Sequence, residues 1–312
     1  METPIAFWIA FNSGILALLA FDLLVLHRRV REIGFREAAV GSALWVALSL
    51  SFCAFVWHWR GPQSGMQFLT GYLVEYSLSA DNIFVFVLIM TFFKVPKELQ
   101  HRVLFWGVLG ALVMRGTMIG VGVYLVEKFH WILYVFGLIL VVSGIKMFMQ
   151  RQEEEVDPEH NPLIRLCRRC VPVTERYEGG RFAVRREGRV FLTPLAIVLI
   201  MVETTDLVFA VDSIPAIFAI TRDPFIVYTS NVCAILGLRS MYFMLAGAMH
   251  RFIFLKAGLS IILTFIGVKM IIMDIFKIPI ELSLTVVAAV LATSIVTSVI
   301  VTRGDRGRPA GD

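Results

Sequence analysis

Charge is scarce in this sequence of 312 residues: 17% of them are charged, whereas about 25% are charged in an ordinary soluble domain. Hydrophobic residues make up 58% and gather in long apolar runs that recur along the whole chain. Runs of about 20 such residues are typical of transmembrane helices and argue against a water-soluble globular fold. The first run has no basic segment before it and no small-residue cleavage site, so we expect a retained helix rather than a signal peptide.

Cysteine is scarce too, and the sequence contains no nucleotide-binding Walker motif, so direct use of ATP is not expected. Cys53 and Cys233 lie in apolar runs, where a thiol serves as a small packing group. Cys167 and Cys170 form the motif CRRC in a polar segment, but the second ligand pair of a zinc site is missing. We expect two reduced thiols on a basic surface.

We predict an all-α membrane protein with about nine transmembrane helices. The candidate spans are residues 5–26, 38–57, 67–93, 102–126, 130–149, 191–220, 226–248, 253–273 and 279–302. The expected organisation is two N-terminal helices (1–66), a three-helix repeat (67–149), a basic cytoplasmic loop (150–190), a second three-helix repeat (191–273), and a ninth helix with a cytoplasmic tail (274–312). The loop is polar and lacks apolar periodicity, so it is predicted to be a mobile or loosely folded linker.

The net charge of +5 does not indicate nucleic-acid binding, because the basic residues follow the membrane topology. Most Lys and Arg residues fall in alternate connections, including the loop 150–190. The opposite side receives only Arg60, Lys128, Arg222 and Lys277. Basic residues concentrate on the cytoplasmic side of membrane proteins. We therefore predict a multi-pass protein of the bacterial inner membrane, with its N-terminus outside and its C-terminus in the cytoplasm.

Two apolar runs contain acidic residues in the same arrangement. The segments are VEYSLSADNIFVF (74–86) and VETTDLVFAVDSIPAIF (202–218). Aligning Asp81 with Asp212 also aligns Glu75 with Asp206, six residues upstream in each segment. An ionisable group at membrane depth is energetically unfavourable and usually functional, marking an ion pathway or a substrate site.

The duplication extends to the basic residues that follow. Arg115 and Arg239 each lie in the next span, and Lys146 and Lys269 each lie in a matching tetrapeptide, GIKM and GVKM. The separations from Arg to Lys are 31 and 30 residues. Because each copy holds three spans, the second copy must be inserted upside down. The sequence therefore predicts a three-plus-three inverted repeat, an architecture common among transporters.

The candidate metal ligands are carboxylate, amide and hydroxyl groups in the two acidic segments. They are Glu75, Asp81, Asn82, Glu203, Asp206, Asp212 and Ser213. Residues seven apart share a helical face, so Glu75 should lie beside Asn82 and Asp206 beside Ser213. Asp81 and Asp212 point elsewhere unless the helix breaks, and Pro215 gives the second segment a reason to break. An all-oxygen set suits a hard divalent cation such as Mg²⁺, Ca²⁺ or Mn²⁺.

The other charged residues inside spans are predicted to pair with each other or to pack. They are Asp22, Arg115, Lys146, Arg239 and Lys269. Buried arginines are good partners for carboxylates, and the two lysines lie near span ends, where their ammonium groups can reach the interface. With Asp22 included, six acidic and four basic side chains lie within spans. A divalent cation would neutralise that difference.

At these residues the chain resembles the TerC family, most closely its Alx-type members. The matching stretches are TGYLVEYSLSADNIFVF (70–86), VETTDLVFAVDSIPAIFAIT (202–221), DPFIVYTSNVCAILGLRSMYF (223–243) and GVKM (267–270). The resemblance implies export of Mn²⁺ from the bacterial cytoplasm, with Glu75, Asp81, Asp206 and Asp212 carrying the ion as transported substrate. Some members of the family are linked to tellurite resistance.

Other functions remain open at this point. The protein could transport another cation, such as Ca²⁺ or H⁺, or exchange a cation for protons. It could instead be a membrane scaffold that helps to metallate secreted proteins, with the loop 150–190 binding partners or anionic lipid. An intramembrane aspartyl protease is disfavoured because the sequence has no GxGD-type element, so we do not expect an enzyme. The expected partners are a divalent metal ion and the lipid bilayer; protein partners are unknown.

Overall fold

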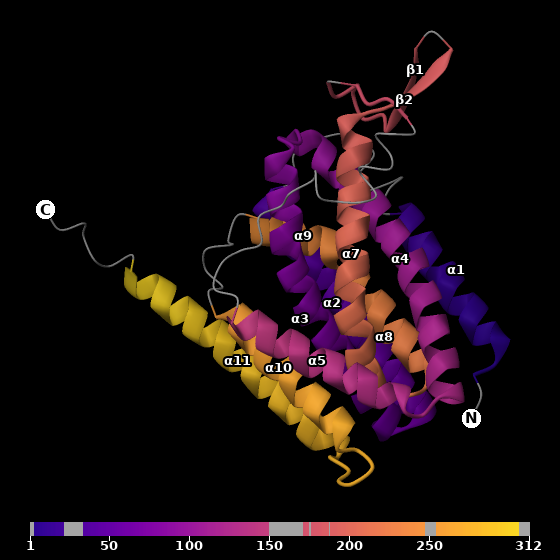
Figure 1. Ribbon diagram of the computed structural model, residues 1–312, viewed down its shortest axis with the longest axis vertical. Coiled ribbons are helices and arrows are strands. Elements are labelled where there is room, and N and C mark those ends of the chain that lie inside the picture. Colours follow the sequence, from indigo (N-terminus) through magenta and orange to yellow (C-terminus); the bar gives the residue numbers. More distant parts are fainter. Residues whose placement is uncertain are drawn as a thin grey trace, which may run out of the picture.

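The computed structural model describes residues 3–21, 34–149, 171–174, 176–186, 188–246 and 254–305, without the side chains of residues 303–305. This part of the chain is almost entirely helical (Figure 1). The helices are α1 (Ile5–Phe21), α2 (Phe35–Arg60), α3 (Pro62–Phe92), α4 (Lys97–Lys128), α5 (Ile132–Met149), α7 (Pro194–Phe218), α8 (Pro224–Leu236), α9 (Leu238–Ala246), α10 (Leu255–Ile271) and α11 (Ile280–Asp305). The predicted class of membrane protein is confirmed, and its described part is mostly helical.

Six helices in the described ranges are long and apolar enough to cross a membrane: α2, α3, α4, α5, α7 and α11. The predicted number of nine spans is not confirmed. Helices α1 and α10 have 17 residues each, and the predicted span 226–248 is not one helix. Its described part forms α8 and α9, which meet at Gly237.

Helix α8 begins where the sequence provides a strong N-terminal signal. The carboxylate of Asp223 accepts hydrogen bonds from the backbone N–H groups of Phe225 (2.9 Å) and Ile226 (3.2 Å). Pro224 occupies the first turn, where the missing N–H is not needed. This cap fixes the start of the helix that brings Asn231 into the interior.

The expected break of the second acidic helix at Pro215 is wrong. Helix α7 runs without interruption from Pro194 to Phe218 and contains Pro215. Proline removes the bond from its own N–H, but only the last turn follows it. That turn is closed by the N–H of Ala219, which donates to the carbonyl of Pro215 (3.1 Å). Asp212 and Ser213 therefore stay on regular helical turns.

Regular structure also occurs in the segment predicted as a linker. Strands β1 (Ala183–Arg186) and β2 (Arg189–Leu192) form an antiparallel hairpin, with Ala183 opposite Leu192 and Arg186 opposite Arg189. Its turn includes Gly188 at φ +78°, a backbone angle that glycine adopts without strain. With strands of only four residues, the apolar alternation is too short to stand out among the arginines. Residues 150–170, including Cys167 and Cys170, lie outside the described residues.

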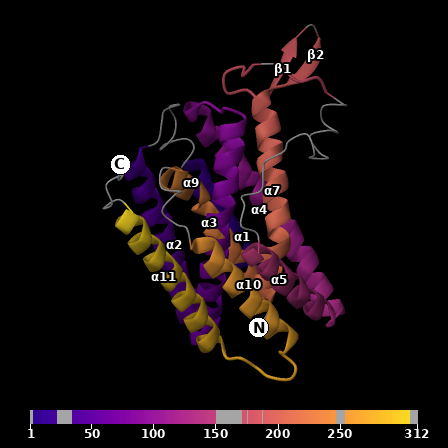
Figure 2. The same ribbon diagram turned by 60° about the vertical axis from the view of Figure 1, so that its left-hand side comes forward.

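The hairpin lies beyond the N-terminal end of α7 and is anchored to the helical bundle (Figures 1 and 2). The phenol of Tyr177, just before the hairpin, donates to the carbonyl of Phe93 (2.7 Å) at the end of α3. Partial burial raises the pKa of this phenol, which favours its protonated, donating form. The guanidinium of Arg102 on α4 stacks over the ring of Phe182. The segment that precedes α7 thus holds the ends of α3 and α4.

Helix α3 forms the centre of the bundle, and its apolar window is 61% buried, more than that of any other candidate span. It packs against α2, α7, α8, α9 and α11. Helix α4 packs on α7 and α8, so α3, α4, α7 and α8 enclose the interior. Helices α5, α10 and α11 form a diagonal group: they lie side by side and run diagonally across the other four helices (Figure 1).

The most extensive contact between two helices joins α5 and α10. Glycines allow their backbones to touch: a Cβ placed on Gly267 would lie 2.7 Å from the carbonyl oxygen of Gly137. A Cβ placed on Gly144 would lie 2.9 Å from the carbonyl oxygen of Ser260. The hydroxyl of Ser260 in turn donates to the carbonyl of Gly144 (2.8 Å). Small residues at such crossings let membrane helices approach closely.

We expect Gly267→Ala to destabilise the protein by about 1–3 kcal/mol, because the added methyl group meets backbone atoms that cannot move away. The apparent melting temperature in detergent should fall. The matched control is Gly120→Ala on α4, where a Cβ has no neighbour within 4 Å. Equal melting temperatures for the two variants would contradict the close crossing.

Candidate functional site

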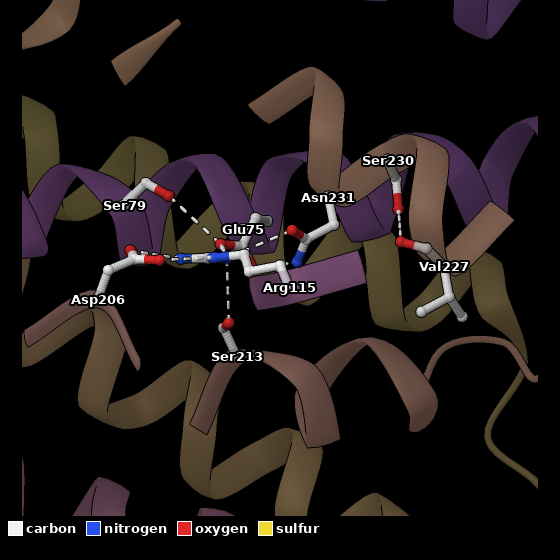
Figure 3. A network of polar contacts seen from close by, with 8 residues as sticks. All are labelled: Glu75, Ser79, Arg115, Asp206, Ser213, Val227, Ser230 and Asn231. Carbon is white, nitrogen blue, oxygen red and sulfur yellow. Dashed lines mark hydrogen bonds and ion pairs between the residues drawn. The ribbon is translucent and has the colours of Figure 1, made fainter. Parts of the chain in front are cut away.

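The centre of the bundle holds a buried arginine between two acidic residues (Figure 3). Arg115 on α4 is 1% exposed, Glu75 on α3 is 0% exposed and Asp206 on α7 is 3% exposed. The guanidinium donates from Nε and Nη2 to the two carboxylate oxygens of Asp206, at 3.1 Å and 2.9 Å. Its Nη1 forms an ion pair with Oε1 of Glu75. One cation therefore bridges two carboxylates from two other helices.

Neutral polar groups complete the surroundings of Nη1. It donates to the hydroxyl of Ser213 on α7 (3.3 Å) and to the side-chain carbonyl of Asn231 on α8 (3.4 Å). The amide nitrogen of Asn231 donates to the second oxygen of Glu75 (3.1 Å), and the Ser79 hydroxyl lies 3.4 Å from Oε1. The cluster thus joins oxygen atoms from α3, α7 and α8 around one nitrogen (Figure 3).

Helical spacing explains how α7 supplies two of these groups. Asp206 and Ser213 are seven residues apart and fall on one face of a regular helix. Both contact Arg115, so the predicted shared face is confirmed. The aligned acids of the two duplicated segments, Glu75 and Asp206, meet on the same guanidinium.

The second aligned pair of acids lies elsewhere. Asp212 accepts a hydrogen bond from the hydroxyl of Ser143 on α5 (2.7 Å), and Lys146 of the same helix acts on it electrostatically. Asp81 is half-buried on α3 and interacts electrostatically with Lys256 on α10. Asp212 therefore interacts with α5 and Asp81 with α10, rather than with Arg115.

Glu203 occupies a separate position on α7, against the backbone of α4. A Cβ on Gly110 would lie 2.0 Å from its Oε1, so the carboxyl group occupies space that glycine leaves open. Its buried Oε2 has no hydrogen-bond partner among the described residues. A small cavity of about 20 Å³, lined by Asp206 and Arg239 with apolar side chains, lies between α3, α4, α7 and α9.

The seven predicted ligands do not converge on one point in this structure. Among the described residues, no three His, Cys, Asp or Glu side chains form a group that could hold a metal ion. Glu75, Asp206 and Ser213 meet at Arg115, whereas Asp81, Asp212 and Glu203 stand apart. Asn82 is buried on α3 but is not a hydrogen-bond partner of Arg115.

The remaining charged candidates in the described ranges are not hydrogen-bond partners of Arg115. Arg239 is buried on α9. Lys269 on α10 donates to the hydroxyl of Ser283 on α11 (2.7 Å), whereas Lys146 on α5 is exposed. Asp22 falls outside the described residues.

One central residue is absent from the sequence prediction. Asn231 contacts both Arg115 and Glu75, although only the carboxylates and their immediate neighbours were expected to form the site. The sequence does contain a signal: Asn231 opens the apolar stretch NVCAILGLRS, whose Arg239 aligns with Arg115. A buried amide in such a stretch must find hydrogen-bond partners.

Apolar helices of membrane-spanning length around a buried cluster of charges define a multi-pass integral membrane protein. The family model for the integral membrane protein TerC family matches residues 60–306. The chain belongs to the TerC family.

Curated relatives resemble the chain over nearly its whole length. An uncharacterized membrane protein of Myxococcus xanthus, STKORF319, is 53% identical over 95% of this chain and 92% of its own. A protein of Escherichia coli strain K12, provisionally named membrane-bound redox modulator Alx, is 46% identical over 98% of both chains. An uncharacterized membrane protein of Rickettsia bellii is 42% identical over 94% of this chain and 97% of its own. No solved structure matches.

We expect Asp206→Asn to lower the stability by about 3–5 kcal/mol, because it removes one partner of a buried ion pair. Thermal unfolding in detergent measures the effect. The control is Arg186→Gln, which removes an exposed pair with Glu178 and should change the melting temperature little. A similar small effect for both variants would mean that the bridge contributes nothing to stability.

Proposed function

We propose that this protein exports Mn²⁺ from the cytoplasm across the bacterial inner membrane, with its N-terminus outside. The observation that carries the proposal is the convergence of the aligned acids Glu75 and Asp206 in the interior of the bundle. Carboxylates buried at membrane depth are unfavourable unless they serve an ion pathway or a structural pair. Their duplication in two segments favours the pathway.

The chemistry of the cluster favours a hard cation. The groups that contact Arg115 are carboxylate, hydroxyl and amide oxygens, and such oxygens suit Mg²⁺, Ca²⁺ and Mn²⁺. The choice of Mn²⁺ among them rests on the resemblance to Alx-type members of the family. The direction of transport rests on the same resemblance.

The packing of the helices supports the inverted repeat. The offset that aligns GIKM with GVKM is 123 residues, and it pairs Gly144 with Gly267 and Gly137 with Ser260. In the crossing of α5 and α10, Gly137 contacts Gly267 while Gly144 contacts Ser260. If each residue is replaced by its aligned counterpart on the other helix, one contact becomes the other. A two-fold axis between the repeats produces this exchange.

The outer acids, Asp81 and Asp212, are proposed to pass the ion to and from the centre. Asp212 faces Ser143 of α5, and Asp81 interacts with Lys256 of α10, the helix that aligns with α5. Asp81 and Asp212 can also accept protons when the ion leaves them. We therefore propose that exchange against protons drives export, with no ATP consumed and no chemical reaction catalysed.

The provisional name of the Alx relatives suggests a different function, in redox control. Of the four cysteines, Cys53 and Cys233 lie in the described ranges, and both are buried in one apolar cluster with Phe68 and Tyr72. Buried thiols in apolar surroundings are unreactive. These two cysteines therefore give no support to thiol chemistry, whereas the charged interior favours ion transport. Transport of another cation and a scaffold role remain the alternatives that the following experiments separate.

We expect cells that express the wild-type protein to contain less manganese than cells with an empty vector. Asp81→Asn and Asp212→Asn should abolish the difference, because each removes a carboxylate from the proposed pathway. Elemental analysis of washed cells measures it. The control is Asp274→Asn, an acidic residue in an exposed contact with Tyr134 outside the bundle interior, which should export like wild type. Equal manganese in all strains would overturn export.

In reconstituted vesicles, we expect Mn²⁺ transport to depend on an imposed pH gradient. An excess of Ca²⁺ should compete only weakly if the site prefers Mn²⁺. Fluorescent indicators for the metal and for internal pH follow both sides of the exchange. Transport that is unchanged when the gradient is collapsed would contradict proton coupling, whereas strong competition by Ca²⁺ would assign the protein to another cation. A scaffold would move no ion at all.

A further inference from the structure

We infer that the guanidinium of Arg115 is a tethered cation that occupies the binding position of the transported ion and must leave before the ion can bind. The inference rests on the proposed function and concerns the regulation of the same site. It assigns to Arg115 a competing and gating role, in addition to its contribution to stability.

Nη1 of Arg115 contacts three oxygens, from Glu75, Ser213 and Asn231, which belong to three different helices. Asp206 holds the other side of the same guanidinium through two further bonds. Oxygens that converge from several helices on one point are the arrangement a hard cation requires. In this structure, that point is a nitrogen of Arg115 (Figure 3).

The guanidinium does not lose its proton in proteins, so Arg115 can release the acids only by moving away from them. Glu75, Asp206 and Arg115 together carry a formal charge of −1 when both acids are ionised. A divalent ion added beside the guanidinium would face a like charge at contact distance, in an interior where such repulsion is strong. An ion that replaces it would neutralise the two carboxylates.

The other polar groups of the cluster can remain in place when the cation changes. Asn231 already holds the second oxygen of Glu75 (3.1 Å), and Ser79 lies near the first. These bonds fix the carboxylate whichever cation faces it. Without substrate, the guanidinium of Arg115 therefore occupies the position between the two acids, and the site is closed. Because either Arg115 or the ion faces them, the two buried carboxylates always have a cation beside them.

The test compares how Mn²⁺ stabilises the purified wild-type protein, Arg115→Gln and Arg115→Lys in detergent. Without metal, Arg115→Gln should melt at a lower temperature, because it leaves two buried acids without their cation. Mn²⁺ should then raise its melting temperature at a concentration at least about tenfold lower than for wild type, since the competitor is gone. Choline chloride at equal ionic strength controls for screening.

The matched control is Arg60→Gln, which removes a guanidinium paired with Asp223 at the end of α2 (2.5 Å). It should leave the response to Mn²⁺ as in wild type. If Arg115→Gln does not fold, Arg115→Lys provides the test. A single ammonium cannot bridge both carboxylates as the guanidinium does, so Mn²⁺ should raise the melting temperature of this variant at a lower concentration than that of wild type.

The same Mn²⁺ dependence for wild type and the Arg115 variants would overturn the inference and leave Arg115 as a structural partner only. Transport in vesicles reports separately on the proposed function. Wild-type protein that transports Mn²⁺, together with Arg115 variants that bind it no more tightly, would refute the gate alone. Wild-type protein that transports no cation would refute the proposed function, whatever the Arg115 variants show.

Discussion

The structure depends on one buried ion bridge, in which the guanidinium of Arg115 holds the carboxylates of Glu75 and Asp206. Removing three charges from water is strongly unfavourable, and only close pairing with further hydrogen bonds offsets it. Arg115 meets this requirement with bonds to both acids, a serine and an asparagine. Because the partners come from α3, α7 and α8, the bridge fixes the register of three helices against α4.

Around this bridge, close helix packing accompanies a few specific polar contacts. Helices α5 and α10 approach until their backbones touch at Gly137 and Gly267, and α11 packs on α10 and α3. In a bilayer, the lipid is as apolar as the side chains, so tight contact between small residues contributes more than burial from water. The diagonal group therefore packs tightly beside Asp81 and Asp212, two of the acids that do not join the bridge.

The same interaction links stability with the proposed transport. A site made of two permanently uncompensated carboxylates would be unfavourable in the resting protein, whereas a site held by its own cation is stable and closed. Exchange of that cation for a divalent ion would leave Glu75 oriented, since Asn231 and Ser79 both contact its carboxylate. A protein of this design would be least stable with its acids exposed, so the open site would be short-lived.

The sequence by itself determined the membrane class, most of the helices and the duplicated acids, because apolar length and repeated spacing are local properties of the chain. It also predicted that Asp206 and Ser213 share a face, which follows from helical geometry alone. Only the tertiary structure decided that α7 continues through Pro215, since a proline in the last turn leaves little helix to disrupt. It also decided that Arg115 stands between the acids and that Asn231 joins them. These contacts join residues 40 to 156 positions apart, and such pairings are set by how helices pack rather than by any local pattern.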